Sequence, residues 1–364
     1  MSVRDLIIIG AGPSGLSAAI AAKQRGLNYQ VLEQGILVNS IYRFPPQMVF
    51  FTTPELLEIG GVPLVSPYEK PTRVEALRYY RRVADAFDLQ IAYREKVLSV
   101  SLEEASLETD AREPSVPVFA VETRSSRGVC RVRHARAVVF AIGYFDHPNR
   151  LNVPGEDLPH VHHYYGEPYP FYRQRVVIVG GGNSAAEAAL EMYRAGVKVT
   201  VVHRWPELKS TIKYWVRPDI ENRLKEGSIA ARFSARLTEI RPSSVVVTRV
   251  SEVGAVHGPA GDSQPRSQDP RAQTGSGEGD EELPADAVFL LTGYRADSDL
   301  MQRAGVRLND RQAPVYDPET FETNVPGLYV AGGALAGEDT GTIFIENGRF
   351  HGEKIVDVID RRLR

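Results

Sequence analysis

The amino-acid sequence predicts an α/β protein of two similar domains, with the second inserted into the first. A short apolar run, a glycine-rich turn and an alanine-rich stretch follow one another twice, at residues 5–22 and 175–194. Each copy continues into another β-branched run, which gives the strand–helix–strand order of a parallel sheet. A later run, 325–333, again reads as a strand ending in glycines. We therefore expect the chain to return to the first domain after completing the second.

The length of 364 residues suits about two domains, each with its own core. We expect 1–150 to form the first part of the outer domain, 151–284 the inserted domain, and 285–364 the second part of the outer domain. Residues 251–282 are rich in Gly, Pro, Ser and acidic side chains and hold almost no large apolar ones. Such a segment cannot bury enough surface to offset its ordering entropy, so we predict a disordered loop there.

The composition excludes several classes of protein. A net charge of −3 gives no electrostatic reason for binding nucleic acid or an anionic membrane. No apolar run approaches the roughly 20 residues that span a bilayer, and because the first residues already read as a strand we expect no signal peptide. The single cysteine, Cys130, excludes an internal disulfide and a C-x-x-C pair. A cytoplasmic location is expected.

The first glycine-rich turn has the spacing of a Rossmann-like dinucleotide site. Gly10, Gly12 and Gly15 form G-x-G-x-x-G between a predicted strand and a predicted helix. Gly10 is expected to make the tight turn, Gly12 to admit a pyrophosphate, and Gly15 to let the helix pack on the strand. The free N–H groups of the helix then face the phosphates. Glu33 ends the next strand, where an acid binds the ribose hydroxyls.

The segment 35–64 follows this first strand pair and is rich in aromatic residues, Pro and Gly. A loop of this length is usually functional, and its place in the chain would let it reach the reactive end of a bound dinucleotide. The alternative is an aromatic loop that only packs under the domain. The polar groups that we predict to contact the cofactor are Asn39, Ser40, Gln47, Thr52 and Thr53.

The rest of the outer domain is predicted from periodicity. Residues 71–89 read as an amphipathic helix that starts at a proline. Residues 91–140 read as short strands, and Cys130 falls in one of them as a small half-buried side chain rather than a catalytic thiol. Two buried runs, 138–143 and 286–293, each end in a glycine, Gly143 and Gly293.

The second glycine-rich turn differs from the first in the charge that follows it. Gly180, Gly181 and Gly182 make the turn, and Ala185 stands at the third glycine position, a tolerated variant. The next strand ends in basic residues where the first copy has an acid. An arginine there grips a 2′-phosphate through bidentate hydrogen bonds, which favours NADP over NAD. The predicted contacts of this site are Gly180, Gly182, Asn183, Ser184, Ala185, His203, Arg204 and Lys209.

These features resemble the thioredoxin-reductase-like flavoproteins with two dinucleotide domains, over essentially the whole chain. Four long stretches (37–64, 71–83, 212–229 and 343–355) are more narrowly similar to the bacillithiol-disulfide reductase family. The resemblance implies FAD in the first domain and NADPH in the inserted one. It further implies cofactor contacts at Pro13, Ser14, Gln34, Val97, Gly143, Gly293, Gly333 and Ala334.

The sequence departs from that family at one position that concerns the chemistry. The family usually has a cysteine between the proline and the last glycine of the first motif, where this chain has Ser14. A hydroxyl is poorly suited to thiol–disulfide exchange. The usual Gly-Asp is also replaced by Gly333 and Ala334, a change shared with the family, so backbone N–H groups would serve the phosphate. His351, in the segment 347–352, is a candidate proton donor or else a structural helix residue.

We therefore expect an enzyme that passes electrons from NADPH through FAD to an acceptor. By resemblance the acceptor is bacillithiol disulfide, and the protein is a homo-oligomer, a dimer or a tetramer. The alternative is a reductase of a small electron-carrier protein of the ferredoxin or flavodoxin type, which Ser14 favours. A flavin-binding sensor and a monooxygenase are further alternatives. Two intact nucleotide sites argue against the sensor, and the lack of a motif for an oxygen intermediate argues against the monooxygenase.

Overall fold

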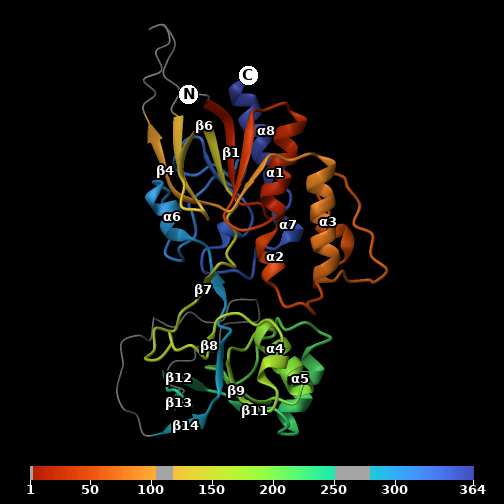
Figure 1. The fold of residues 1–364 in the computed structure, drawn as a ribbon, viewed down its shortest axis with the longest axis vertical. Coiled ribbons are helices and arrows are strands. Elements are labelled where there is room, and N and C mark those ends of the chain that lie inside the picture. The colour runs from red at the N-terminus through yellow and green to blue at the C-terminus, as the bar shows by residue number, and fades with distance from the viewer. Residues whose placement is uncertain (1–2, 104–117, 251–278) are drawn as a thin grey trace. The chain divides into compact units, whose positions relative to one another are not determined.

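The computed structural model describes residues 3–103, 118–250 and 279–364, which form two compact units (Figure 1). The first unit joins the chain up to Pro148 to the chain from Tyr294 onward, and the second unit runs from Asn149 to Gly293. Each unit contains its own sheet with parallel strands flanked by helices. The predicted α/β fold with Rossmann-like units is thus confirmed.

The first unit is built on a seven-stranded sheet in the order β3-β2-β1-β6-β5-β4, with β17 also paired to β6. Its strands are β1 (Val3–Ile9), β2 (Tyr29–Glu33), β3 (Ile91–Tyr93), β4 (Glu95–Glu103), β5 (Val118–Ser125), β6 (Cys130–Phe140) and β17 (Leu328–Val330). The strands β1, β2, β3, β6 and β17 pair in parallel, whereas β4 and β5 are antiparallel. One edge of β6 changes partner along its length, from β5 at its start to β17 at its end.

Helices cover this sheet, and two of them approach each other closely. The helices are α1 (Pro13–Gln24), α2 (Asn39–Arg43), α3 (Arg73–Ala86), α6 (Ser298–Arg303), α7 (Ile345–Gly348) and α8 (His351–Leu363), with short 3₁₀ turns at Pro54–Leu57 and Gly332–Ala336. A small pair, β7 (His147–Pro148) with β16 (Tyr294–Arg295), completes the unit. Helix α8 runs beside α1 (Figure 1). The approach requires Gly352, because a Cβ there would lie 2.3 Å from the backbone nitrogen of Ala18.

The second unit has a parallel sheet with a small antiparallel sheet on one face. The parallel sheet runs β11-β10-β9-β15-β8, and the small sheet runs β12-β13-β14. Apolar side chains of α4 fill one face, and those of the small sheet fill the other. The elements are β8 (Val161–His162), a 3₁₀ turn (Tyr169–Phe171), β9 (Arg175–Val179), α4 (Asn183–Arg194), β10 (Lys198–Val202), α5 (Arg217–Lys225), β11 (Ala230–Arg232), β12 (Ala235–Ile240), β13 (Ser244–Arg249), β14 (Asp280–Pro284) and β15 (Ala287–Leu290).

Two predicted boundaries are corrected by this pairing. Strand β15 was expected in the outer domain, but Val288 pairs with Val177 of β9, so β15 and Gly293 belong to the second unit. The predicted disordered loop 251–282 falls mostly on 251–278, which lie outside the described residues. The prediction of disorder is wrong for residues 280–282, because β14 begins at Asp280 and pairs with β13. Within the described ranges, no helix has the length and apolar character needed to cross a bilayer.

Candidate functional site

The first glycine-rich turn is a place where side chains would collide with backbone. Gly10 has φ of +109°, and a Cβ there would lie 2.3 Å from the carbonyl oxygen of Ala141. A Cβ on Gly15 would lie 2.0 Å from the carbonyl oxygen of Gly10. Gly12, the N-cap of α1, instead has nothing within 4 Å of its Cβ position. The strand, turn and helix therefore pack tightly at Gly10 and Gly15, and leave the helix N-terminus open at Gly12.

Glu33 fixes the shape of this turn from the end of β2. Its side chain is 5% exposed, and its two carboxylate oxygens accept hydrogen bonds from the N–H groups of Ala11 (2.8 Å) and Gly35 (2.7 Å). Burial raises the pKa of this carboxyl, and the two amides act in the opposite direction. The neighbouring Gln34 donates to Asp146 at 2.9 Å. Each carboxylate oxygen of Glu33 keeps a second lone pair for a ribose hydroxyl.

Three segments that are distant in sequence meet beside this turn. Gly332 has φ of +62°, and a Cβ on it would lie 2.3 Å from Oγ of Ser14. A Cβ on Gly348 would also lie close to the Ser14 hydroxyl, at 3.2 Å. The N–H of Gly332 donates to Nδ1 of His351 at 3.1 Å. The Gly332 amide is thus used within the chain, which leaves Gly333 and Ala334 as the predicted phosphate donors of this segment.

The environment of His351 supports the structural alternative for this residue. Its ring stacks on Phe321 with centroids 4.4 Å apart, and its Nδ1 accepts the Gly332 N–H. Burial, and then the charge of Lys354, lowers the pKa of His351 to about 4. The imidazole is therefore neutral at pH 7 with its proton on Nε2, and it is not a cationic acid there. Its Nδ1 contacts the backbone at the start of the segment that follows β17.

The aromatic segment after β2 packs against the same turn. Val38 has φ of +46°, and its N–H donates to the carbonyl oxygen of Ala11 at 3.1 Å. The ring of Phe44 makes edge contacts with Phe50 and Phe145. Helix α2 starts at Asn39 and continues through Ser40, whereas Gln47 and the buried Thr52 lie in the following loop. This segment therefore packs as an aromatic cluster and also brings polar side chains along the turn.

Two further predicted contacts fall on separate strands of the first unit. Val97 is buried in β4, which starts where the Arg94 N–H donates back to the carbonyl oxygen of Gly35 at 3.1 Å. Gly143 follows β6 with φ of +62° and has nothing within 4 Å of its Cβ position. Gly35 and Gly143 thus follow strands whose carboxyl ends lie at the same edge of the sheet.

The second glycine-rich turn repeats the tight packing of the first. Gly180 has φ of +153°, and a Cβ there would lie 2.5 Å from the carbonyl oxygen of Leu291, which follows β15. The same Cβ position is 3.1 Å from Cβ of Ala185, so the alanine at the third motif position also packs closely against the turn. Gly182 is the N-cap of α4, and Ser184 in its first turn is exposed. Gly293, with φ of +96°, lies in this unit just beyond Leu291.

A strap of residues 209–213 crosses the start of α4. The Lys209 N–H donates to the Gly181 carbonyl oxygen at 2.9 Å. Asn183 binds the strap twice, because its Nδ2 donates to the Thr211 carbonyl oxygen (3.1 Å) and its Oδ1 accepts from the Lys213 N–H (2.8 Å). Asn183 therefore holds the strap in place with its side chain, rather than leaving that side chain free for a ligand.

Basic side chains lie at the end of β10, at the position that contacts the ribose in Rossmann-like folds. His203 is 6% exposed, and its ring lies against Gly181, whose Cβ would be 2.3 Å from Cε1 of His203. Burial first, and then the charges of Arg204 and Lys209, lowers the pKa of His203 to about 4. The guanidinium of Arg204 lies over the Trp205 ring, 5.5 Å from its centroid. Arg204 and Lys209 thus supply positive charge beside a neutral His203.

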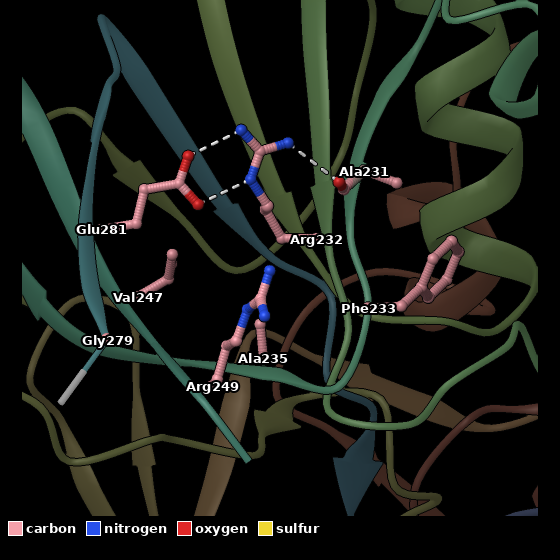
Figure 2. Close-up of a pocket in the computed structure, with 8 residues that line it drawn as sticks. All are labelled: Ala231, Arg232, Phe233, Ala235, Val247, Arg249, Gly279 and Glu281. Atoms are coloured by element: carbon pink, nitrogen blue, oxygen red, sulfur yellow. Dashed lines mark hydrogen bonds and ion pairs between the residues drawn. The ribbon is translucent and has the colours of Figure 1, made fainter. Parts of the chain in front are cut away.

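A cavity of about 250 Å³ opens near the end of β11 (Figure 2). Arg232 on its wall binds both carboxylate oxygens of Glu281, at 2.7 and 2.6 Å, and donates to the Ala231 carbonyl oxygen. The charge of Arg232 is therefore balanced. None of the residues predicted from the sequence to bind a cofactor lines this cavity, so we do not assign it to the reaction.

Cys130 lies far from the first glycine-rich turn. It is exposed at the first position of β6, not half-buried as predicted, while Phe140 at the other end of β6 pairs with Ile9 just before Gly10. Ten residues at about 3.3 Å each separate the two ends by about 30 Å. The only thiol of the chain therefore lies about 30 Å from the turn that is predicted to hold the phosphates.

Comparisons with known proteins agree with this geometry. The sequence matches the family model described as pyridine nucleotide-disulphide oxidoreductase over residues 7–258 and 263–332. A bacilliredoxin reductase from Bacillus subtilis (strain 168) is 37% identical over 98% of this chain and 97% of its own. The solved bacillithiol disulfide reductase of Bacillus cereus is 35% identical with a TM-score of 0.85, covering 99% of this chain and all of that one. A ferredoxin–NADP reductase from Ignicoccus hospitalis is 24% identical over 91% of this chain and 90% of its own.

Proposed function

The chain belongs to the pyridine nucleotide-disulphide oxidoreductase family, and within it we propose an NADPH-dependent flavoprotein that reduces bacillithiol disulfide. The resemblance predicted from the sequence is confirmed by relatives that cover nearly the whole chain. The observation that assigns one cofactor to each unit is the difference in charge between the residues that follow the two glycine-rich turns. A buried carboxylate, Glu33, follows the first, and Arg204 follows the second.

The first unit fits FAD. Gly12 leaves the N-terminus of α1 open, where backbone N–H groups and the helix dipole favour a pyrophosphate. Glu33 is held beside it by two backbone amides, with lone pairs left for a ribose. Bound FAD supplies a two-electron relay between NADPH and the disulfide. We propose that Gly10, Gly12, Gly15 and Glu33 hold the nucleotide end, and that Gly333 and Ala334 add backbone donors.

The second unit fits NADPH rather than NADH. Among the described residues no carboxylate forms an ion pair with Arg204, so its guanidinium keeps its charge for a ligand. A 2′-phosphate is a dianion with the oxygen geometry that a guanidinium binds through two hydrogen bonds. Lys209, whose backbone is fastened to Gly181, adds a second positive charge. We propose that Arg204 and Lys209 select NADPH.

The electrons leave this chain without an enzyme dithiol. The sequence has one cysteine, it lies about 30 Å along β6 from the first turn, and the family's cysteine position is Ser14. The overall reaction balances as NADPH, one proton and one disulfide giving NADP⁺ and two thiols. The disulfide bond takes up both electrons. Ser14 lies against Gly332 and Gly348 and contributes a hydroxyl, not a thiolate, at that junction.

The acceptor is tested by anaerobic stopped-flow. The reduced holoenzyme is mixed with bacillithiol disulfide, with a bacilliredoxin carrying a bacillithiol mixed disulfide, or with ferredoxin. Rapid flavin reoxidation by bacillithiol disulfide supports the proposal, and reoxidation by ferredoxin alone would overturn it in favour of the electron-carrier alternative. Ser14→Cys in the same assay shows whether a thiol at this position accelerates the disulfide reaction.

The coenzyme is tested separately from the acceptor. Arg204→Ala should raise the KM for NADPH by about tenfold to a hundredfold, since a charge-assisted pair is lost, and should leave the KM for NADH nearly unchanged. The control is Arg241→Ala, which removes the same charge from an arginine already paired with Glu239 and Glu282. If wild-type flavin is reduced equally fast by NADPH and NADH, the assignment of NADPH is wrong.

We also propose a cytoplasmic homo-oligomer. The expectation of the cytoplasm rests on composition, and that of a dimer or tetramer on resemblance to the family. Light scattering coupled to size exclusion measures the mass of the holoprotein in solution. A mass equal to the 364-residue monomer at micromolar concentration would contradict the second statement.

A further inference from the structure

Strand β12, which no sequence motif marks as part of the coenzyme site, begins directly beside residues 203–205, which follow β10. The Ala235 N–H donates to the His203 carbonyl oxygen at 3.1 Å, and the Ser234 N–H donates to the Trp205 carbonyl oxygen at 3.1 Å. Strand β12 therefore starts against residues 203–205. Its second residue is Arg236, which is partly buried.

Several polar atoms at this place are buried and lack a partner in the part of the chain that the structure describes. They are Nε2 of His203, Nε1 of Trp205 and Nε of Arg236. A buried donor without an acceptor costs on the order of 1–3 kcal/mol, so chains rarely leave several together. Arginine and tryptophan nitrogens can only donate hydrogen bonds. Nε1 of Trp205 and Nε of Arg236 therefore each lack an acceptor.

The charges of the arginines near this place also indicate a site for an anion. Arg236 stands close enough to Arg204 for its positive charge, after burial, to lower the pKa of the Arg204 guanidinium. Two nearby arginines are paired with carboxylates instead: Arg232 of β11 pairs with Glu281, and Arg241, which follows β12, pairs with Glu239 and Glu282. Two like charges that repel each other near buried donors are compensated when an anion with several oxygens binds both of them.

We propose that Arg236 binds the 2′-phosphate of NADPH together with Arg204 and so determines coenzyme specificity. This inference rests on the proposed use of NADPH and adds to it a residue from outside the Rossmann-like sheet. Arg204 reaches the phosphate from the end of β10, and Arg236 reaches it from β12. A phosphomonoester dianion is the ligand class that this pair fits, because it offers three oxygens and two negative charges.

The test is calorimetric titration of the full-length holoprotein with adenosine 2′,5′-bisphosphate and with adenosine 5′-monophosphate. Arg236→Ala should weaken binding of the bisphosphate by about tenfold to a hundredfold and leave the monophosphate unaffected. Arg236→Lys, which keeps the charge without the planar fork, should give an intermediate loss. The matched control, Arg241→Ala, should leave both affinities as in wild type. Circular dichroism melts of all variants show that the second unit remains folded.

The outcomes separate this inference from the coenzyme proposal. If Arg204→Ala removes the preference for the bisphosphate while Arg236→Ala keeps it, Arg236 does not bind the phosphate and NADPH still stands. Equal weakening of both ligands by Arg236→Ala would show a loss of local structure and overturn the specific role. If wild-type protein binds the two ligands equally, both the coenzyme proposal and this inference are wrong.

Discussion

Replacing Gly352 with alanine should push apart the two helices beside the first glycine-rich turn. A Cβ on Gly352 would lie 2.3 Å from the nitrogen and 2.8 Å from Cα of Ala18, and 2.8 Å from the Ser14 carbonyl oxygen. These are backbone atoms that cannot rotate away, so α8 must shift by about 1 Å to reach an ordinary contact of about 3.5 Å. Overpacking of this kind costs about 1–3 kcal/mol. The better helix propensity of alanine returns at most about 1 kcal/mol.

We therefore expect Gly352→Ala to lower the free energy of unfolding of the first unit by about 1–2 kcal/mol. Because Ser14 lies in the first turn of α1, FAD should also dissociate more readily. Urea unfolding followed by flavin fluorescence reports on this unit. The control is Gly166→Ala in the second unit, where nothing lies within 4 Å of the new Cβ. If Gly352→Ala unfolds at the same urea concentration as wild type, the packing argument is refuted.

Three further predictions concern polar groups that are buried or half-buried. The pKa of His351 is about 4 in the folded chain and about 6.5 in the unfolded chain. The contribution of His351 to the free energy of unfolding is therefore complete above about pH 6.5, and it is lost as the pH falls toward 4 because the unfolded chain binds the proton first. His351→Phe should thus flatten the urea-measured stability of the first unit across that range by about 1–2 kcal/mol, allowing for solvent screening; an unchanged slope would contradict this. Glu33→Gln places an amide donor against the N–H of Ala11 or Gly35, so the Kd for FAD should rise about tenfold or more in ultrafiltration assays, and unchanged retention would rule out the role of Glu33. Tyr165→Phe removes the 2.7 Å donor of the half-buried Glu191 and should cost the second unit about 1–3 kcal/mol by hydrogen exchange, with FAD retained; full protection would count against the bond.

The parts of the fold that depend on local pattern could be predicted from the sequence. The glycine spacings identify both turns, and the amphipathic stripe identifies α3, whose start is set by a capping box between Thr72 and Glu75. Strand β15 could not be assigned, because its buried run resembles the end of β6 and only pairing with β9 decides its unit. The start of β14 was not predicted for a similar reason. Its acidic residues read as loop, yet Glu281 and Glu282 are held by Arg232 and Arg241 from elsewhere in the chain.

The candidate site shows the same limit. The sequence motifs predict the glycines, Glu33 and Arg204, because each of these residues stands at a fixed distance from a glycine-rich turn. The state of His351 depends on burial beside Phe321 and on the Gly332 amide, which no local pattern encodes. Arg236 reads as an ordinary outward residue of an alternating strand. Its relation to Arg204 follows only from the backbone hydrogen bonds between β12 and residues 203–205.

The change of partner along β6 has a consequence for biosynthesis. The end of β6 pairs with Leu328–Val330, which the ribosome makes only after the whole of the second unit. The second unit is one continuous stretch and can fold as it emerges, whereas the nascent first unit waits with an open hydrogen-bonding edge at Val138–Phe140. Open edges of apolar strands are sites of aggregation. Translation arrested near Gly293 should therefore leave an intermediate that depends on chaperones until the last 71 residues arrive.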